Sequence, residues 1–128
     1  MTKVLFVEGR ADLRTMIQDA LAEVGYDVEA ISAEPAGVAA CASSQPDLII
    51  YDRDGLAPDS VDAVDSLIGR LTRDGRDPVI ALSDDAEDAV NAVRCALCLP
   101  APLDIDALIV AAAGLLNGEL TGSHGTLH

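Results

Sequence analysis

Short apolar runs alternate along this sequence with longer stretches in which apolar residues recur at helical spacing. The run that ends at Asp52 is continuously apolar and is bounded by Pro46 and Gly55, which predicts a strand buried on both faces of a sheet. Polar and apolar residues alternate in 26–31, which predicts a strand with only one face covered. With the remaining runs, the predicted strands are 3–7, 26–31, 48–51, 78–82 and 97–99.

The stretches between these runs carry the signals of helix ends. Gly25 and Gly118 stand where helices commonly terminate. Pro35 suits the first turn of a helix, and Asp104 can cap the last one. The predicted helices are 11–24, 36–43, 60–71, 86–95 and 105–117. On their inner faces we expect, among others, Leu13, Met16, Ile17, Leu21 and Val24 of the first helix and Val90 and Val93 of the fourth.

Strands that alternate with helices predict an α/β fold, here a doubly wound, five-stranded parallel sheet flanked by five helices. The 128 residues suffice for one domain with a core of its own. We assign residues 1–118 to this domain. Residues 119–128 are polar and contain Gly and Ser, so we expect them to form a flexible C-terminal tail.

The net charge of −14, from 22 acidic and 8 basic residues, disfavours nucleic acids and anionic membrane surfaces as partners. The sequence has neither a membrane-length apolar stretch nor a signal-peptide layout, so we expect a cytoplasmic protein. Cys95 and Cys98 have the spacing of a metal or redox pair, but a second pair and a flanking His are missing. Small buried hydrophobic side chains are the favoured interpretation of these cysteines.

Polar residues stand at the ends of three predicted strands. Glu8 follows the first strand, Asp52 the third and Ser83 the fourth. The C-terminal ends of parallel strands meet at one rim of a doubly wound sheet, where such folds bind their ligands. These side chains are therefore expected to share a pocket although they are far apart in the sequence.

In order and spacing, these segments resemble the receiver domain of two-component response regulators, and the resemblance covers residues 3–117. The matching segments are 4–7 with the acid after it, 46–52, 78–83 and 100–104. The resemblance implies the flavodoxin-like receiver fold. It also implies a phosphoryl switch, in which Asp52 is the phosphoacceptor and becomes an aspartyl phosphate.

The resemblance assigns roles to the other residues of the rim. An acidic pair after the first strand holds a magnesium ion that neutralises the developing charge, so Glu8 and Asp52 are the candidate metal ligands. Asp54 is assigned with Glu8 to the acidic pocket, and Asp54 or Asp84 could supply another oxygen. Ser83 corresponds to the hydroxyl that hydrogen-bonds the phosphoryl group. A Lys after the fifth strand pairs with the same oxygens, and an aromatic residue just before that Lys reports the state to partners.

The sequence departs from this pattern in four places. Gly9 replaces the second acid of the pair, and Ala101 stands at the position of the family Lys. Cys98 occupies the aromatic position, and the stretch from Ser83 to Ala101 is about one helical turn shorter than usual. With fewer anionic ligands a hard cation binds poorly, so a magnesium site is doubtful. We therefore expect phosphorylation of Asp52 to be impaired or absent.

Two basic residues lie beside the predicted rim. Arg10 follows the first strand and Arg53 follows the third, and either could take over the charge of the missing Lys. Nothing in the sequence requires either of them to do so.

These observations favour an atypical, stand-alone receiver that acts as a protein-interaction module in two-component signal transduction and is not an enzyme. Its expected partners are a histidine kinase, a phosphotransfer protein or a downstream effector. The Ala- and Leu-rich surfaces of the last and fourth helices are candidate faces for a partner or a homodimer. One alternative is a phosphorylatable receiver that relays phosphate through Asp52. A remote alternative is a small α/β enzyme or nucleotide-binding domain, for which a glycine-rich phosphate loop is missing.

Overall fold

The structure, a computed structural model, describes residues 2–32, 34–40, 45–56, 58–71, 78–93, 95–100 and 104–117. The strands are β1 (Lys3–Val7), β2 (Asp27–Ile31), β3 (Leu48–Asp52), β4 (Val79–Leu82) and β5 (Leu97–Leu99). The helices are α1 (Ala11–Glu23), α2 (Pro35–Ala40), α3 (Val61–Leu71), α4 (Ala86–Val93) and α5 (Ile105–Leu116). All strand pairs are parallel, and the order is β2-β1-β3-β4-β5. This is the flavodoxin-like order, so the predicted fold class is confirmed.

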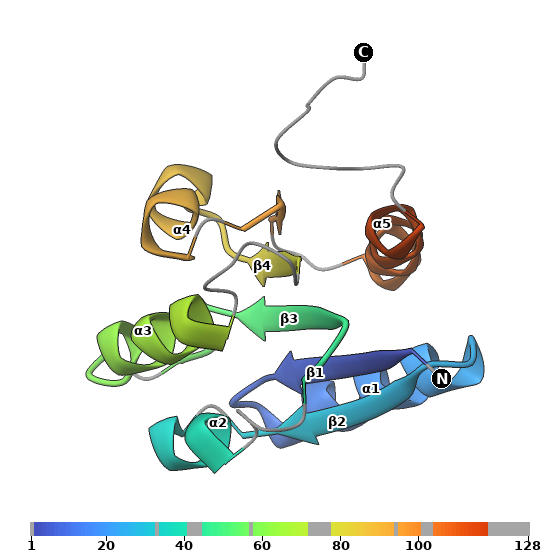
Figure 1. The fold of residues 1–128 in the computed structure, drawn as a ribbon, viewed down its shortest axis with the longest axis horizontal. Coiled ribbons are helices and arrows are strands. Elements are labelled where there is room, and N and C mark those ends of the chain that lie inside the picture. The colour runs from blue at the N-terminus through green and yellow to red at the C-terminus, as the bar shows by residue number, and fades with distance from the viewer. Residues whose placement is uncertain are drawn as a thin grey trace.

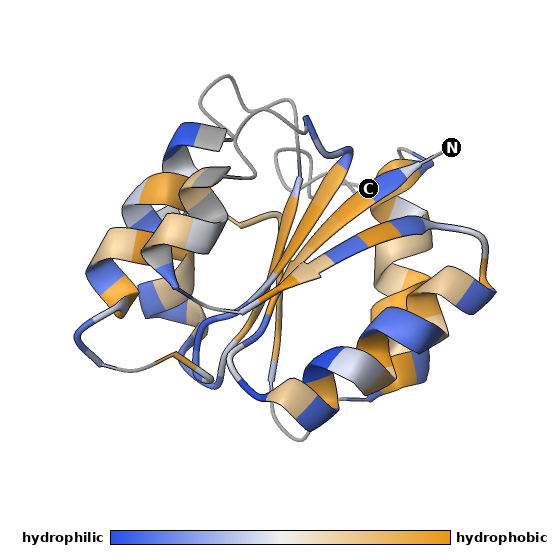
Figure 2. Cartoon of the chain, turned by 90° about the horizontal axis from the view of Figure 1, so that it is seen from below, coloured by the Kyte–Doolittle hydropathy of each residue, from blue (hydrophilic) through white to orange (hydrophobic). Residues whose placement is uncertain are grey.

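Helices cover both faces of the sheet. Figure 1 shows α2, α3 and α4 on one side of the strands and α1 and α5 on the other. The apolar strands lie between these two layers in Figure 2. Among the described residues, no helix is long and apolar enough to cross a membrane.

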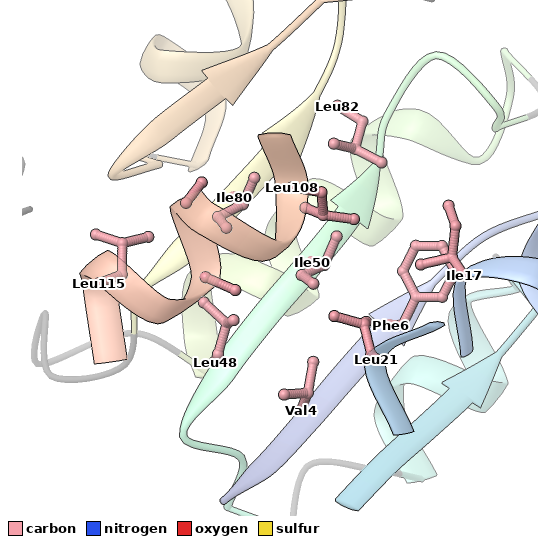
Figure 3. Close-up of a cluster of buried hydrophobic side chains, with 12 residues drawn as sticks. Val4, Phe6, Ile17, Leu21, Leu48, Ile50, Ile80, Leu82, Leu108 and Leu115 are labelled. Carbon is pink, nitrogen blue, oxygen red and sulfur yellow. The ribbon is translucent and has the colours of Figure 1, made fainter. Parts of the chain in front are cut away.

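The central strand β3 is buried at all five positions, as its continuous apolar run predicts. Leu48 and Ile50 pack on the α1 and α5 side, where they join the cluster drawn in Figure 3. Ile49 and Tyr51 point to the opposite face and pack with residues of α3. This alternation follows from the two-residue period of a strand. Asp52 is the last residue of β3 and therefore lies at the rim.

Several predicted positions and boundaries differ from the structure. Met16 and Val24 are 49% and 51% exposed although we expected them on the inner face of α1. Ile17 and Leu21, one helical turn apart, fill that face, and Val24 caps the helix end. Val90 is likewise largely exposed.

The fourth helix is shorter than predicted. It ends at Val93, and Cys95 lies outside it because the next residue already pairs with β4. At the start of α5, Asp104 accepts hydrogen bonds from the N–H groups of residues 106 and 107, so the predicted cap is confirmed. Ala101, Gly118, the tail 119–128 and the end of the predicted helix 36–43 lie outside the described residues.

Candidate functional site

The ends of three adjacent strands bring Glu8, Asp52 and Ser83 to one rim. The register pairs Val7 of β1 with Tyr51 of β3, and Asp52 with Leu82 of β4. All three polar residues are buried, with Glu8 fully inaccessible to solvent. Strand order thus places these residues together, as the topology of a doubly wound sheet predicts.

Arg10 connects the two buried carboxylates. Its Nη2 donates to Asp52 Oδ2 and, at 3.4 Å, to Glu8 Oε1. Its Nε donates to Glu8 Oε2 at 3.3 Å, and its backbone N–H donates to the same oxygen at 3.0 Å. The Arg10 side chain is 58% exposed, so the guanidinium closes the acid pair from the solvent side. One guanidinium therefore forms ion pairs with both carboxylates.

The neighbouring residues fix this arrangement. Arg14 Nη1 donates to the backbone carbonyl of Glu8 at 2.7 Å. The Arg10 backbone is extended at the start of α1, so its side chain can fold back over the strand end. The Glu8 side chain is long enough for its carboxylate to accept a hydrogen bond from the backbone N–H of Arg10, two residues further along the chain.

The pKa values of the two acids, Glu8 and Asp52, are shifted in opposite directions. Burial and the adjacent Glu8 carboxylate raise the pKa of Asp52 to about 7, although hydrogen bonds from Arg10 act in the opposite direction. Burial alone would raise the pKa of Glu8, but hydrogen bonds to Asp52 and Arg10 outweigh it, and this pKa is lowered. The pair therefore retains a shared proton up to about neutral pH.

Asp54 contacts a different set of groups. Ser83 Oγ donates to Asp54 Oδ1 at 2.9 Å, and the N–H of Asp84 donates to Asp54 Oδ2 at 2.8 Å. The N–H of Asp85 donates in turn to Ser83 Oγ at 3.1 Å. Asp54 thus contacts Ser83, one of the predicted rim residues, and its carboxylate accepts from the loop that begins α4. Asp54 lies beyond the end of β3, where side chains no longer alternate between the two faces of the sheet.

Gly55 lies against the acid pair. Its N–H donates to Asp52 Oδ1 at 3.0 Å. A Cβ at this position would lie 2.8 Å from Glu8 Oε2 and 3.2 Å from Asp52 Cγ. Both distances are shorter than ordinary van der Waals contacts, so the close approach of backbone to carboxylates requires glycine here.

Gly55→Ala is expected to lower the free energy of unfolding by about 1–3 kcal/mol, because the added methyl must displace the Glu8 and Asp52 carboxylates. Urea unfolding measures this. The matched control is Gly69→Ala in α3, where a Cβ meets nothing within 4 Å. That change should be neutral or stabilising by up to about 1 kcal/mol, since alanine is the better helix former. Equal effects at the two positions would contradict the crowding argument.

Arg53 does not face Asp52, and of the two basic candidates Arg10 holds that place. The Arg53 guanidinium forms a fork with Asp65 of α3, with Nε–Oδ1 at 3.1 Å and Nη2–Oδ2 at 2.9 Å. Its Nη1 donates to Asp88 of α4. Tyr51 donates its hydroxyl to Asp65 Oδ1 at 2.6 Å, and burial together with Asp65 raises the pKa of Tyr51. Arg53 therefore links β3 to α3 and α4.

The two described cysteines are partly buried thiols. Cys98 Sγ donates to the backbone carbonyl of Ser83 at 3.3 Å, so this thiol lies beside the rim. Burial raises the pKa of both Cys95 and Cys98, which disfavours their thiolates. Within the described part of the chain, no group of three or more His, Cys, Asp or Glu side chains is arranged to hold a metal ion.

Sequence reasoning missed the cluster around Asp65. This residue is four positions after Val61 and three before Ile68, so it falls on the buried face of α3. A carboxylate at such a position needs a partner, and that spacing was the signal available in the sequence.

Comparison with known proteins supports the fold. Neither protein-family models nor curated proteins match this sequence. Among solved structures, the receiver domain of the Francisella response regulator 1452 has a TM-score of 0.74 at 21% identity, over 92% of this chain and 98% of that one. The chemotaxis response regulator CheY4 of Vibrio cholerae has a TM-score of 0.71 at 21% identity, over 88% and 97%. The chain therefore has the fold of a signal receiver domain.

A third similar structure bears on the metal. The receiver domain of the sensor histidine kinase PA1611 from Pseudomonas aeruginosa PAO1 has a magnesium ion coordinated in its active-site cleft. Its TM-score is 0.73 at 21% identity, over 91% of this chain and 98% of that one. At such identities the likeness describes the fold, and the chemistry must be argued from the residues of this chain.

Proposed function

We propose that this protein is an atypical receiver that works as a protein-interaction module in two-component signal transduction, with phosphorylation of Asp52 impaired or absent. The observation that supports this most directly is the bridge from Arg10 to both Glu8 and Asp52. The proposal gives the module a signalling role with no catalysis of its own. Histidine kinases, phosphotransfer proteins and downstream effectors are its proposed classes of partner.

The donor set around Asp52 fits a divalent cation poorly. Magnesium requires several oxygen ligands, and Gly9 supplies no side-chain oxygen where the family pattern has an acid. The two remaining carboxylates already share the positive charge of Arg10. A guanidinium in this position supplies part of the positive charge that a divalent metal ion would bring, so a cation gains less by binding these carboxylates.

The same contacts make Asp52 a poor phosphoacceptor. A nucleophilic carboxylate must be ionised and have a free oxygen. Asp52 accepts from Arg10 at one oxygen and from the N–H of Gly55 at the other, and its pKa, raised to about 7, leaves a large part of it protonated near neutral pH. Both oxygens are engaged in hydrogen bonds, which lowers their nucleophilicity toward a phosphoryl donor.

Exposed apolar residues on the last helices favour a role in protein contact. Val110 of α5 is 70% exposed and Val90 of α4 is 45% exposed. These helices were the candidate faces for a partner or a homodimer. A protein partner or a second copy would remove such side chains from water.

The decisive experiment follows backbone amide resonances of the full chain during titration with beryllofluoride and magnesium. We expect no saturating shifts at millimolar reagent around Asp52 and Ser83. Asp52→Asn is the control, since its response should match that of the original protein. Saturating shifts that disappear in Asp52→Asn would contradict the proposal and establish the alternative, a receiver that relays phosphate through Asp52.

A further inference from the structure

The loop between β4 and α4 holds a pair of hydrogen-bond donors that converge on one anion. The Ser83 hydroxyl and the N–H of Asp84 point to the two oxygens of the Asp54 carboxylate, at 2.9 Å and 2.8 Å. The N–H of Asp85 donates to Ser83 Oγ, which leaves the hydroxyl proton directed at Asp54. Ser83 is buried, so this orientation is set by the protein. We call Ser83 Oγ and Asp84 N the donor cradle.

A second connection joins the same two segments. The backbone N–H groups of Arg53 and Asp54 both approach the carbonyl of Leu82, at 3.1 Å and 3.5 Å. The Arg53 guanidinium reaches Asp88, which lies in the first turn of α4. The two residues after Asp52 therefore hold the end of β4, the loop and the start of α4 together.

We propose that Asp54 is a built-in anionic ligand of the donor cradle, which holds residues 83–93 in the arrangement of this structure without a phosphoryl group on Asp52. The inference deepens the proposed function and rests on it. A carboxylate has two acceptor oxygens and here meets two donors, as an external anion would. Arg10 supplies the cation of the rim and Asp54 supplies the anion, so both charges belong to the chain.

According to this proposal, the arrangement of α4 does not depend on the Asp52 carboxylate. The Asp52 carboxylate bonds to Arg10 and Gly55, whereas Ser83 bonds to Asp54. A change confined to Asp52 should thus leave the donor cradle filled. A change at Asp54 should empty it while the acid pair and Arg10 remain in place.

Hydrogen exchange of the full chain, read by NMR or mass spectrometry, tests this. In Asp54→Ala we expect the amides of 83–93 to exchange about tenfold faster or more, because two charge-assisted hydrogen bonds are lost. Asp54→Asn keeps one acceptor oxygen and should give a smaller increase. Amides of α1 and β1 should keep the rates of the original protein in both variants.

Two controls make the test specific. Asp52→Asn should leave exchange in 83–93 unchanged, and Asp59→Ala removes an exposed acid of equal charge and should do the same. The proposal is overturned if Asp54→Ala leaves these amides unchanged, accelerates the whole chain equally, or has no more effect than Asp52→Asn. A beryllofluoride response in the original protein would refute the proposed function by itself, so the two failures are distinguishable.

Discussion

Arg53→Met is expected to lower the free energy of unfolding by about 3–5 kcal/mol at neutral pH, because it leaves the Asp65 carboxylate buried without its cation. Both side chains are only 10% exposed, and the two parallel hydrogen bonds of the fork are lost together. Tyr51 would remain the one partner among the contacts described for Asp65, and a neutral hydroxyl cannot balance the charge. Urea unfolding at constant pH measures the loss.

The other arm of Arg53 provides a matched control. Asp88 is 57% exposed, so Asp88→Ala should cost less than about 1 kcal/mol, as is usual for ion pairs in water. Arg53→Lys keeps the charge but cannot form the fork, and an intermediate loss is expected. If Arg53→Met and Asp88→Ala proved equally mild, the bond to Asp65 would contribute little and the argument would fail.

The fold followed from the sequence because its signals are periodic. The unbroken apolar run of β3, the alternation in β2 and the helical spacing of α3 each correspond to a way of burying side chains. The meeting of Glu8, Asp52 and Ser83 at one rim then followed from the rule for parallel strands. The periodic pattern gave a wrong prediction at Met16, because the apolar face of α1 is wider in the sequence than the face that is buried in the structure.

The contacts of the site could not be predicted from the periodicity of the sequence. Arg10 and Arg53 both follow a strand directly, and their long side chains have several rotamers with very different reach. One turns toward Asp52, whereas the other turns to Asp65 because that buried acid on α3 needs a cation. The hydrogen bonds from Ser83 and from the N–H of Asp84 to Asp54 were likewise not predicted. The direction of a side chain beyond the end of a strand depends on the local turn and on partner residues from other elements.

Arg10→Ala is expected to destabilise the protein in a pH-dependent way. Since Arg10 lowers the pKa of Asp52, its removal raises that pKa further above the unfolded value near 3.8. An acid whose pKa is higher in the folded state binds more protons when folded, so stability falls as pH rises from the unfolded to the folded pKa. In the original protein this fall ends at about pH 7, and in Arg10→Ala it should continue to higher pH.

The expected loss in Arg10→Ala is about 2 kcal/mol at pH 8, below the value for a fully buried pair because the guanidinium is 58% exposed and screened by water. At pH 5 the loss should be smaller, since a proton on Asp52 takes over part of the neutralisation. Arg14→Ala is the control: it removes an equal charge that contacts only the Glu8 carbonyl among the bonds described, so its loss should not vary with pH.

Urea unfolding of all three proteins at several pH values from 5 to 8 measures these differences. Magnesium chloride at millimolar concentration should stabilise Arg10→Ala but not the original protein, because the guanidinium and a divalent cation compete for the same two carboxylates. Parallel stability curves for Arg10→Ala and the original protein would show that Arg10 does not neutralise the acid pair. The proposal that Asp52 phosphorylation is impaired would then rest on Gly9 alone, which supplies no side-chain oxygen.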